Sequence, residues 1–126
     1  MSLRNFILNF DRDLAFTYKT AITADGYSSD IETGCDGSGV GVPLFVVVMV
    51  SAVGGTSPTL DITVCSKATA SPTTSDAVGT MPQITANGMY HFSLPQNVKN
   101  FVNLNYNIGG TGTPTFTITA FLTTLI

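Results

Sequence analysis

The single histidine, His91, is the side chain best suited to acid–base chemistry near neutral pH. It lies between Met89 and Ser93 on the outer face of a predicted strand. No nucleophile is close to it in the sequence, so a catalytic triad would need a distant Ser and a distant Asp. We interpret His91 as a surface or interface residue, and we predict that the chain is not an enzyme.

Acidic side chains beside a Gly-rich segment could supply oxygens to a calcium ion, which needs about six to eight of them. The candidates are Asp30, Glu32 and Asp36, the last of which begins an Asp-Gly-Ser-Gly sequence. The acidic spacing and terminal Glu of an EF-hand loop are missing. One histidine and two cysteines are too few donors for a four-ligand zinc site. We predict a glycine turn here, with no metal and no cofactor.

The two cysteines, Cys35 and Cys65, could form one disulfide. The first ten residues lack the continuous apolar core and cleavage site of a signal peptide. For a chain made in the cytosol, reduced thiols are the default. We therefore expect two thiols, and the sequence leaves their pairing open.

Two groups of residues are candidates for an interface with another protein. One is a row of three asparagines that alternates with apolar residues, as only a strand arranges them. Amides donate and accept hydrogen bonds without introducing charge, so the row is either a solvated strand face or an interface ladder. The other is an apolar N-terminal patch, either a core strand or an arm that packs on a neighbouring subunit. The residues are Asn103, Asn105 and Asn107 in the row, and Phe6, Ile7, Leu8 and Phe10 in the patch.

The composition favours assembly with other proteins. Charged residues make up 10% of the 126 residues, against roughly 25% in an average soluble domain, and apolar residues make up 44%. The net charge is −3 and the five basic residues are scattered, which argues against nucleic-acid binding. The longest apolar run, residues 44–50, is far shorter than the roughly 20 residues of a membrane-spanning helix, so we predict no membrane partner.

Hydrophobic periodicity predicts an all-β chain, because no segment of ten or more residues has helical spacing. We expect an antiparallel β-sandwich that is jelly-roll-like, in which Gly54-Gly55 and Gly109–Gly112 end strands and residues 68–80 form an exposed loop. A single domain is expected, with an N-terminal arm and possible first strand in residues 1–25 and the sandwich in residues 26–126. The predicted strands cover residues 14–19, a short stretch at Ile31, and residues 44–53, 59–67, 81–85, 90–94, 102–108 and 115–126.

Four of these segments also carry a family resemblance. They are Gly41-Val-Pro-Leu-Phe-Val-Val-Val-Met-Val50, Leu60-Asp-Ile-Thr-Val64, Tyr90-His-Phe-Ser-Leu-Pro95 and Phe101-Val-Asn-Leu-Asn-Tyr-Asn-Ile-Gly-Gly-Thr111. Their order and spacing, over roughly residues 30–126, resemble those of the phage capsid cement proteins of a family named after a Bordetella phage. Asp13-Leu14-Ala15-Phe16 resembles the opening segment of that family more weakly. The chain departs from the family pattern around Phe101, where Lys99 and Asn103 stand in a segment that tends to carry Arg on either side of the aromatic residue.

The resemblance implies a structural virion protein with a jelly-roll-type sandwich. Such a decoration or cement protein binds the outside of a tailed-phage head and stabilises contacts between major capsid proteins. It implies a homo-oligomer, a trimer or a dimer, that is made in the bacterial cytoplasm and resides on the capsid surface. The alternative is a carbohydrate-binding or host-adhesion module of the phage particle, for which Tyr27 is a candidate exposed aromatic residue.

Overall fold

The computed structural model describes residues 15–33, 44–69, 77–95 and 98–123. These residues form seven strands of one antiparallel sheet, and they contain no helix that is long and apolar enough to cross a membrane. The strands are β1 (Ala15–Ile22), β2 (Gly26–Tyr27), β3 (Ile31–Glu32), β4 (Phe45–Lys67), β5 (Ala77–Thr80), β6 (Gly88–Ser93) and β7 (Phe101–Thr123).

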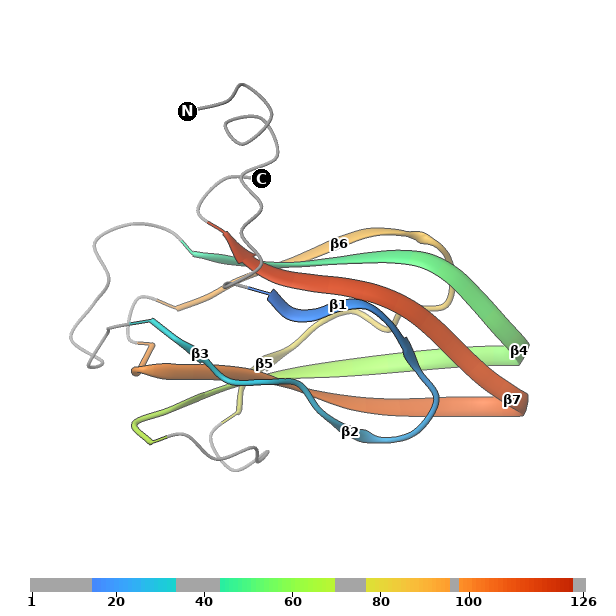
Figure 1. Ribbon diagram of the computed structural model, residues 1–126, viewed down its shortest axis with the longest axis horizontal. Coiled ribbons are helices and arrows are strands. Elements are labelled where there is room, and N and C mark those ends of the chain that lie inside the picture. The colour runs from blue at the N-terminus through green and yellow to red at the C-terminus, as the bar shows by residue number, and fades with distance from the viewer. Residues whose placement is uncertain (1–14, 34–43, 70–76, 96–97, 124–126) are drawn as a thin grey trace, which may run out of the picture.

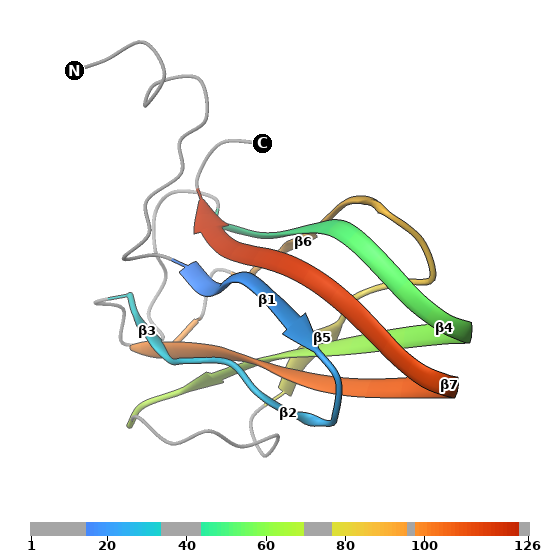
Figure 2. The same ribbon diagram turned by 45° about the vertical axis from the view of Figure 1, so that its right-hand side comes forward.

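Two long strands, β4 and β7, organise the fold. Each has 23 residues, and they pair antiparallel from Phe45 opposite Thr123 to Lys67 opposite Phe101. Both strands bend at the same end of the molecule, where the register shifts around Thr56 (Figures 1 and 2). Each strand therefore contributes its two halves to two different layers.

The layers have the strand order of a jelly roll. The first layer contains β1, residues 115–123 of β7, residues 45–54 of β4 and β6, in that order. The second layer contains β2 and β3, residues 101–109 of β7, residues 59–67 of β4 and β5. With β2 and β3 counted as one interrupted strand, this gives two four-stranded layers, as in a double-sheet jelly roll. The prediction of an all-β, jelly-roll-like sandwich is confirmed.

Apolar residues from both layers fill the space between them. Inward-facing and outward-facing positions alternate in residues 59–67 and 102–108, as the sequence pattern predicts, whereas residues 44–53 carry apolar residues on both faces of the strand. Burying such a side chain contributes about 1.5–3 kcal/mol, so these strands can hold the layers together without charged contacts. The fully buried members include Val46, Val48, Leu60, Ile62, Leu104, Phe116 and Ile118.

The glycine pairs at the bend do not end the strands, contrary to the sequence prediction. Gly55 and Gly110 have φ values of 98° and 115°, which only glycine adopts readily. A Cβ atom on Gly55 would lie 2.7 Å from the Cα of Pro114, and one on Gly110 would lie 2.9 Å from the Cα of Pro58. Both strands fold over together at this point, and their pairing resumes on the far side of the bend.

Two other sequence predictions are wrong at the edge of the second layer. Residues 77–80, expected in an exposed loop, form β5 because they pair with Thr63, Val64 and Cys65 of β4. Residues 81–85, expected as a thin strand, contribute only a single bridge between Ile84 and Leu60. The small and polar residues around β5 have little β-propensity, so the sequence did not predict this strand, which extends the sheet beside the core.

The two open sides of the sandwich differ. On the β5–β6 side, the ring of Phe92 packs against Gly79, where a Cβ atom would lie 2.4 Å from the ring. This contact joins the two layers and requires a glycine. On the β1–β2 side a groove of about 610 Å³ lies between the layer edges.

Candidate functional site

The outer face of the first layer carries most of the exposed large apolar side chains. Met49 of β4 pairs with Met89 of β6, and their exposed fractions are 42% and 68%. Tyr27, at 50%, is the other exposed large apolar residue in the described part of the chain. We call one part of this outer face the methionine face, which comprises Phe45, Val47, Met49, Met89, His91, Ser93 and Phe121.

The methionine face has a packed centre and an exposed margin. Val47 pairs with Phe121 on one side and His91 on the other, and both apolar residues are buried although they point away from the core. His91 is exposed, as the sequence predicted. The exposed methionines therefore lie next to apolar side chains of the same face that are buried.

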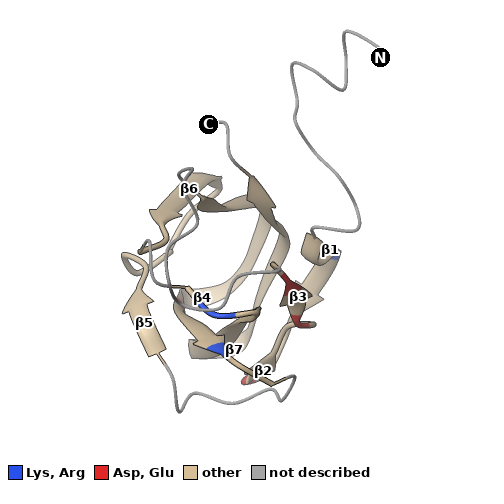
Figure 3. Ribbon diagram, turned by 90° about the vertical axis from the view of Figure 1, so that its left-hand side faces the viewer, with Lys and Arg blue, Asp and Glu red and all other residues tan. Residues whose placement is uncertain are grey.

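No residue of the methionine face is Lys, Arg, Asp or Glu. The charged residues of the described ranges lie on β1, on β3 and the turns beside β2 and β3, on residues 59–67 of β4, and just before β7. Lys19 of β1 adjoins the face, because its backbone N–H donates to the hydroxyl of Thr119, which pairs with Met49. In Figure 3, β6 has neither blue nor red residues, whereas β3 is partly red. A partner that covers β6 would thus desolvate no Lys, Arg, Asp or Glu of that strand.

The predicted asparagine row lies on the outer face of the second layer. Asn103, Asn105 and Asn107 pair with Cys65, Thr63 and Asp61 of β4. Exposure falls along the row: Asn107 is exposed, Asn105 is half-buried, and Asn103 is fully buried.

Within the described residues, neither the nitrogen nor the oxygen of the Asn103 side-chain amide has a hydrogen-bond partner. Leaving a buried polar group unpaired costs about 1–3 kcal/mol. Only the Asn105 and Asn107 end of the row is accessible to another protein in the isolated chain.

Asp30 and Glu32, which were considered as calcium ligands, interact with other side chains. Asp30 accepts from the buried Lys67 at 3.4 Å, and Glu32 accepts from the side-chain amide of Asn100 at 3.2 Å. The described ranges contain no cluster of three or more His, Cys, Asp or Glu residues that could hold a metal ion. Asp36 lies outside those ranges, so the absence of a metal here stays a prediction.

Other predicted residues also fall outside the description. Phe6, Ile7, Leu8 and Phe10 of the apolar N-terminal patch lie outside the described residues, as does Cys35. Cys65 is fully buried on the outer face of the second layer. The structure therefore leaves the N-terminal interface and the cysteine pairing as predictions.

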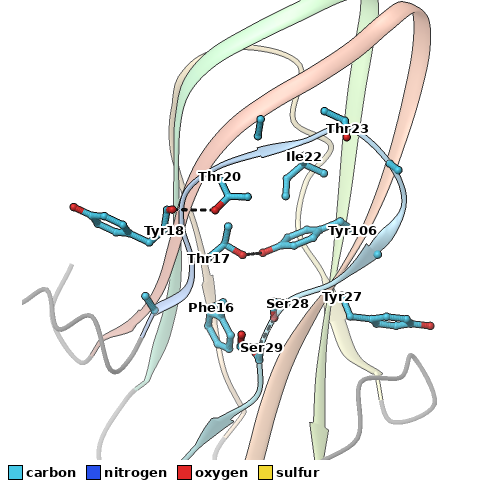
Figure 4. Close-up of a pocket in the computed structure, with 14 residues that line it drawn as sticks. Phe16, Thr17, Tyr18, Thr20, Ile22, Thr23, Tyr27, Ser28, Ser29 and Tyr106 are labelled. Atoms are coloured by element: carbon cyan, nitrogen blue, oxygen red, sulfur yellow. Dashed lines mark hydrogen bonds between the residues drawn. The ribbon is translucent and has the colours of Figure 1, made fainter.

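The groove between β1 and β2 was not predicted from the sequence. Its floor contains the buried Phe16, Ile22 and Tyr106, and Tyr106 shares a hydrogen bond with the hydroxyl of Thr17 (Figure 4). Burial raises the pKa of Tyr106 to about 12, although the hydrogen bond with Thr17 opposes that shift. The hydroxyl of Tyr106 is therefore neutral near pH 7. No spacing pattern in the sequence brings Thr17 and Tyr106 together, because 89 positions separate them.

A hydrogen bond from β7 holds the turn that forms one end of the groove. The backbone N–H of Ile108 donates to the Asp25 carboxylate at 2.9 Å. On the second layer, the Ser28 hydroxyl donates to the carbonyl of Ser29 and accepts from the backbone N–H of Leu104. These bonds hold the β2 side of the groove against β7.

A scan of protein-family models gives no match to this chain, and neither does a search of curated proteins.

Proposed function

We propose that this chain is a capsid decoration, or cement, protein that binds the outside of a tailed-phage head and stabilises contacts between major capsid proteins. The observation that carries the proposal is the methionine face. Exposed Met49 and Met89 lie beside the buried Val47 and Phe121, and no residue of the methionine face is Lys, Arg, Asp or Glu. Exposed apolar patches on soluble proteins mark interaction sites, and methionine is enriched at interface cores.

The architecture agrees with this role. A jelly roll is common in capsid proteins, although the same architecture also supports lectins and cupins. The resemblance to the cement-protein family, over roughly residues 30–126, supports a location on a phage head. The proposed partners are the major capsid protein and further copies of this chain, arranged as a trimer or a dimer.

The mode of action is binding rather than catalysis. Many copies repeated by the symmetry of a shell give an avidity that exceeds the affinity of one contact. Modest apolar faces are sufficient for this purpose, because each copy needs to contribute only part of the total.

The test is reconstitution on heads that lack the protein. Purified protein is mixed with such heads, and the bound fraction is measured after sedimentation. We expect saturable binding that resists a rise in salt concentration, since the contact is apolar. Absence of binding, under conditions in which native particles retain the protein, would contradict the proposal.

Two variants locate the contact. Met89→Lys places a charge on the methionine face at an exposed position and should weaken binding at least about tenfold. Ala68→Lys adds the same charge at an exposed position just beyond β4 in the second layer, and it should bind like the wild type. Equal binding by both variants would remove the methionine face from the contact.

A further inference from the structure

The groove between β1 and β2 has the chemistry of a site for a neutral, hydroxyl-rich ligand. None of the fourteen residues that line it is charged near neutral pH. Eight of them carry hydroxyls, contributed by Ser, Thr and Tyr side chains on both layers. Phosphate or carboxylate ligands would find no cationic partner among these residues, and a metal ion would find no carboxylate or imidazole.

The hydroxyls differ in what they can offer to a ligand. The Thr20 hydroxyl donates to the carbonyl of Tyr18, and the Ser28 hydroxyl is already engaged at the base. Within the described part of the chain, the side-chain hydroxyls of Thr23 and Ser29 have no hydrogen-bond partner, and both residues are exposed. Thr23 and Ser29 therefore provide accessible donors and acceptors, while the hydroxyls of Thr17, Ser28 and Tyr106 are engaged at the base.

Two tyrosine rings lie at the margins of the groove, on opposite sides of it. Tyr27 lines the groove and is half exposed, and Figure 4 shows its ring extending outward at one side. Tyr18, on the opposite side, already has the Lys19 ammonium 5.4 Å from its ring centroid. Tyr27 pairs with Asn105, so its ring lies on the outer face of the second layer, at the margin of the groove. It supplies the more accessible apolar ring face at that margin.

The shape of the strand edges favours a compact ligand over an added peptide strand. A peptide that extends a sheet needs a regular edge. The edge of β1 has two register shifts and a left-handed Lys19 with φ of 46°, and β2 has only two residues. The volume of about 610 Å³ is within the usual range of small-molecule sites, roughly 300–1,000 Å³.

We infer that the β1–β2 groove binds a neutral saccharide, with Thr23 and Ser29 bonding to its hydroxyls. This inference does not depend on capsid binding, because the groove opens between the layer edges at β1 and β2, whereas the methionine face is part of the outer face of the first layer. Neutral glycans on a bacterial surface and free oligosaccharides share this chemistry.

The first experiment is an array of neutral, sialylated and sulphated glycans probed with the full chain. We expect binding to neutral glycans, which is then measured by NMR titration with the neutral trisaccharide that binds best. Backbone amide shifts should concentrate at residues 20–29. Failure of every neutral glycan to bind, or binding of anionic glycans alone, would overturn the inference.

Matched variants then test the site. Ala24→Trp fills the groove from an exposed position and should reduce affinity at least about tenfold, whereas Ala86→Trp, an exposed control beside β6, should not change it. Thr23→Val keeps the shape of an exposed side chain and should reduce affinity several-fold through the lost hydroxyl. If Ala24→Trp and Thr23→Val both retain the dispersed spectrum and the affinity of the wild type, the saccharide site is not in this groove.

Discussion

Met49 and Met89 lie directly opposite each other across the β4–β6 pair, and both side chains are exposed. Directly opposed residues are the closest side-chain neighbours in an antiparallel sheet. The pair therefore forms one continuous apolar surface at the end of the methionine face, rather than two isolated residues. A surface of this kind is the expected centre of a contact with another chain.

Self-association should depend on this pair. The double variant Met49→Lys, Met89→Lys is expected to shift the protein to monomer, because an interface would have to bury two unpaired charges. Thermal unfolding should change little, since both positions are exposed. Sedimentation velocity of the variant and of Ala68→Lys provides the measurement and its control. A variant that keeps the wild-type oligomer would place self-association elsewhere.

Asn103 should limit the stability of the isolated chain. Asn103→Leu removes two buried amide atoms that have no partner within the described residues and keeps the branched outline of the side chain, so we expect the free energy of unfolding to rise by about 1–3 kcal/mol. Asn107→Leu, at an exposed position in the same row, should change it by less than about 0.5 kcal/mol. Urea unfolding compares the two. A loss of stability in Asn103→Leu would show that the amide has a partner.

Gly79 should be intolerant of a side chain because Phe92 occupies the space of its Cβ atom. We expect Gly79→Ala to reduce the free energy of unfolding by about 1–3 kcal/mol, as overpacking does. Phe92→Leu frees that space, so the double variant should lose less than the sum of the two single variants. Strict additivity in this double-mutant cycle would rule out the Gly79–Phe92 contact as the cause.

Tyr106 should make the fold sensitive to strong alkali. Its pKa is about 12 in the folded chain and near 10 when unfolded, so deprotonation favours the unfolded state. Stability from this residue is complete below about pH 10 and is lost as the pH rises toward 12. The expected loss is about 2–3 kcal/mol.

Tyr106→Phe separates this contribution from other groups that titrate in alkali. The variant loses the hydrogen bond to Thr17, so it should be less stable than the wild type at pH 8. The difference between the two proteins should narrow between pH 10 and pH 12 in chemical unfolding. A difference that stays constant over this interval would contradict a raised pKa.

The sequence predicted the elements whose burial alternates. The inward positions of residues 44–53, 59–67 and 102–108 are apolar because one strand face contacts the core, and the structure confirms these strands. It did not predict that Gly54-Gly55 bends a continuous strand, because a positive φ at glycine is compatible with either a turn or a bend. That choice depends on the partner strand bending at the same place.

The candidate surfaces were less predictable than the strands. The asparagine row lies on one face as predicted, but its graded burial depends on neighbours distant in the sequence. Met49 and Met89 are 40 positions apart, and only the pairing of β4 with β6 makes them one surface. The groove likewise requires β1 and β2 to lie at the edges of opposite layers.

The most direct test of the proposed role is a density map of an intact phage particle that contains this protein. The account predicts a two-layered jelly roll on the outside of the shell, with Met49 and Met89 buried against a capsid subunit or a second copy of the chain. A map that places the chain away from the head, or leaves both methionines exposed to solvent on it, would contradict the account.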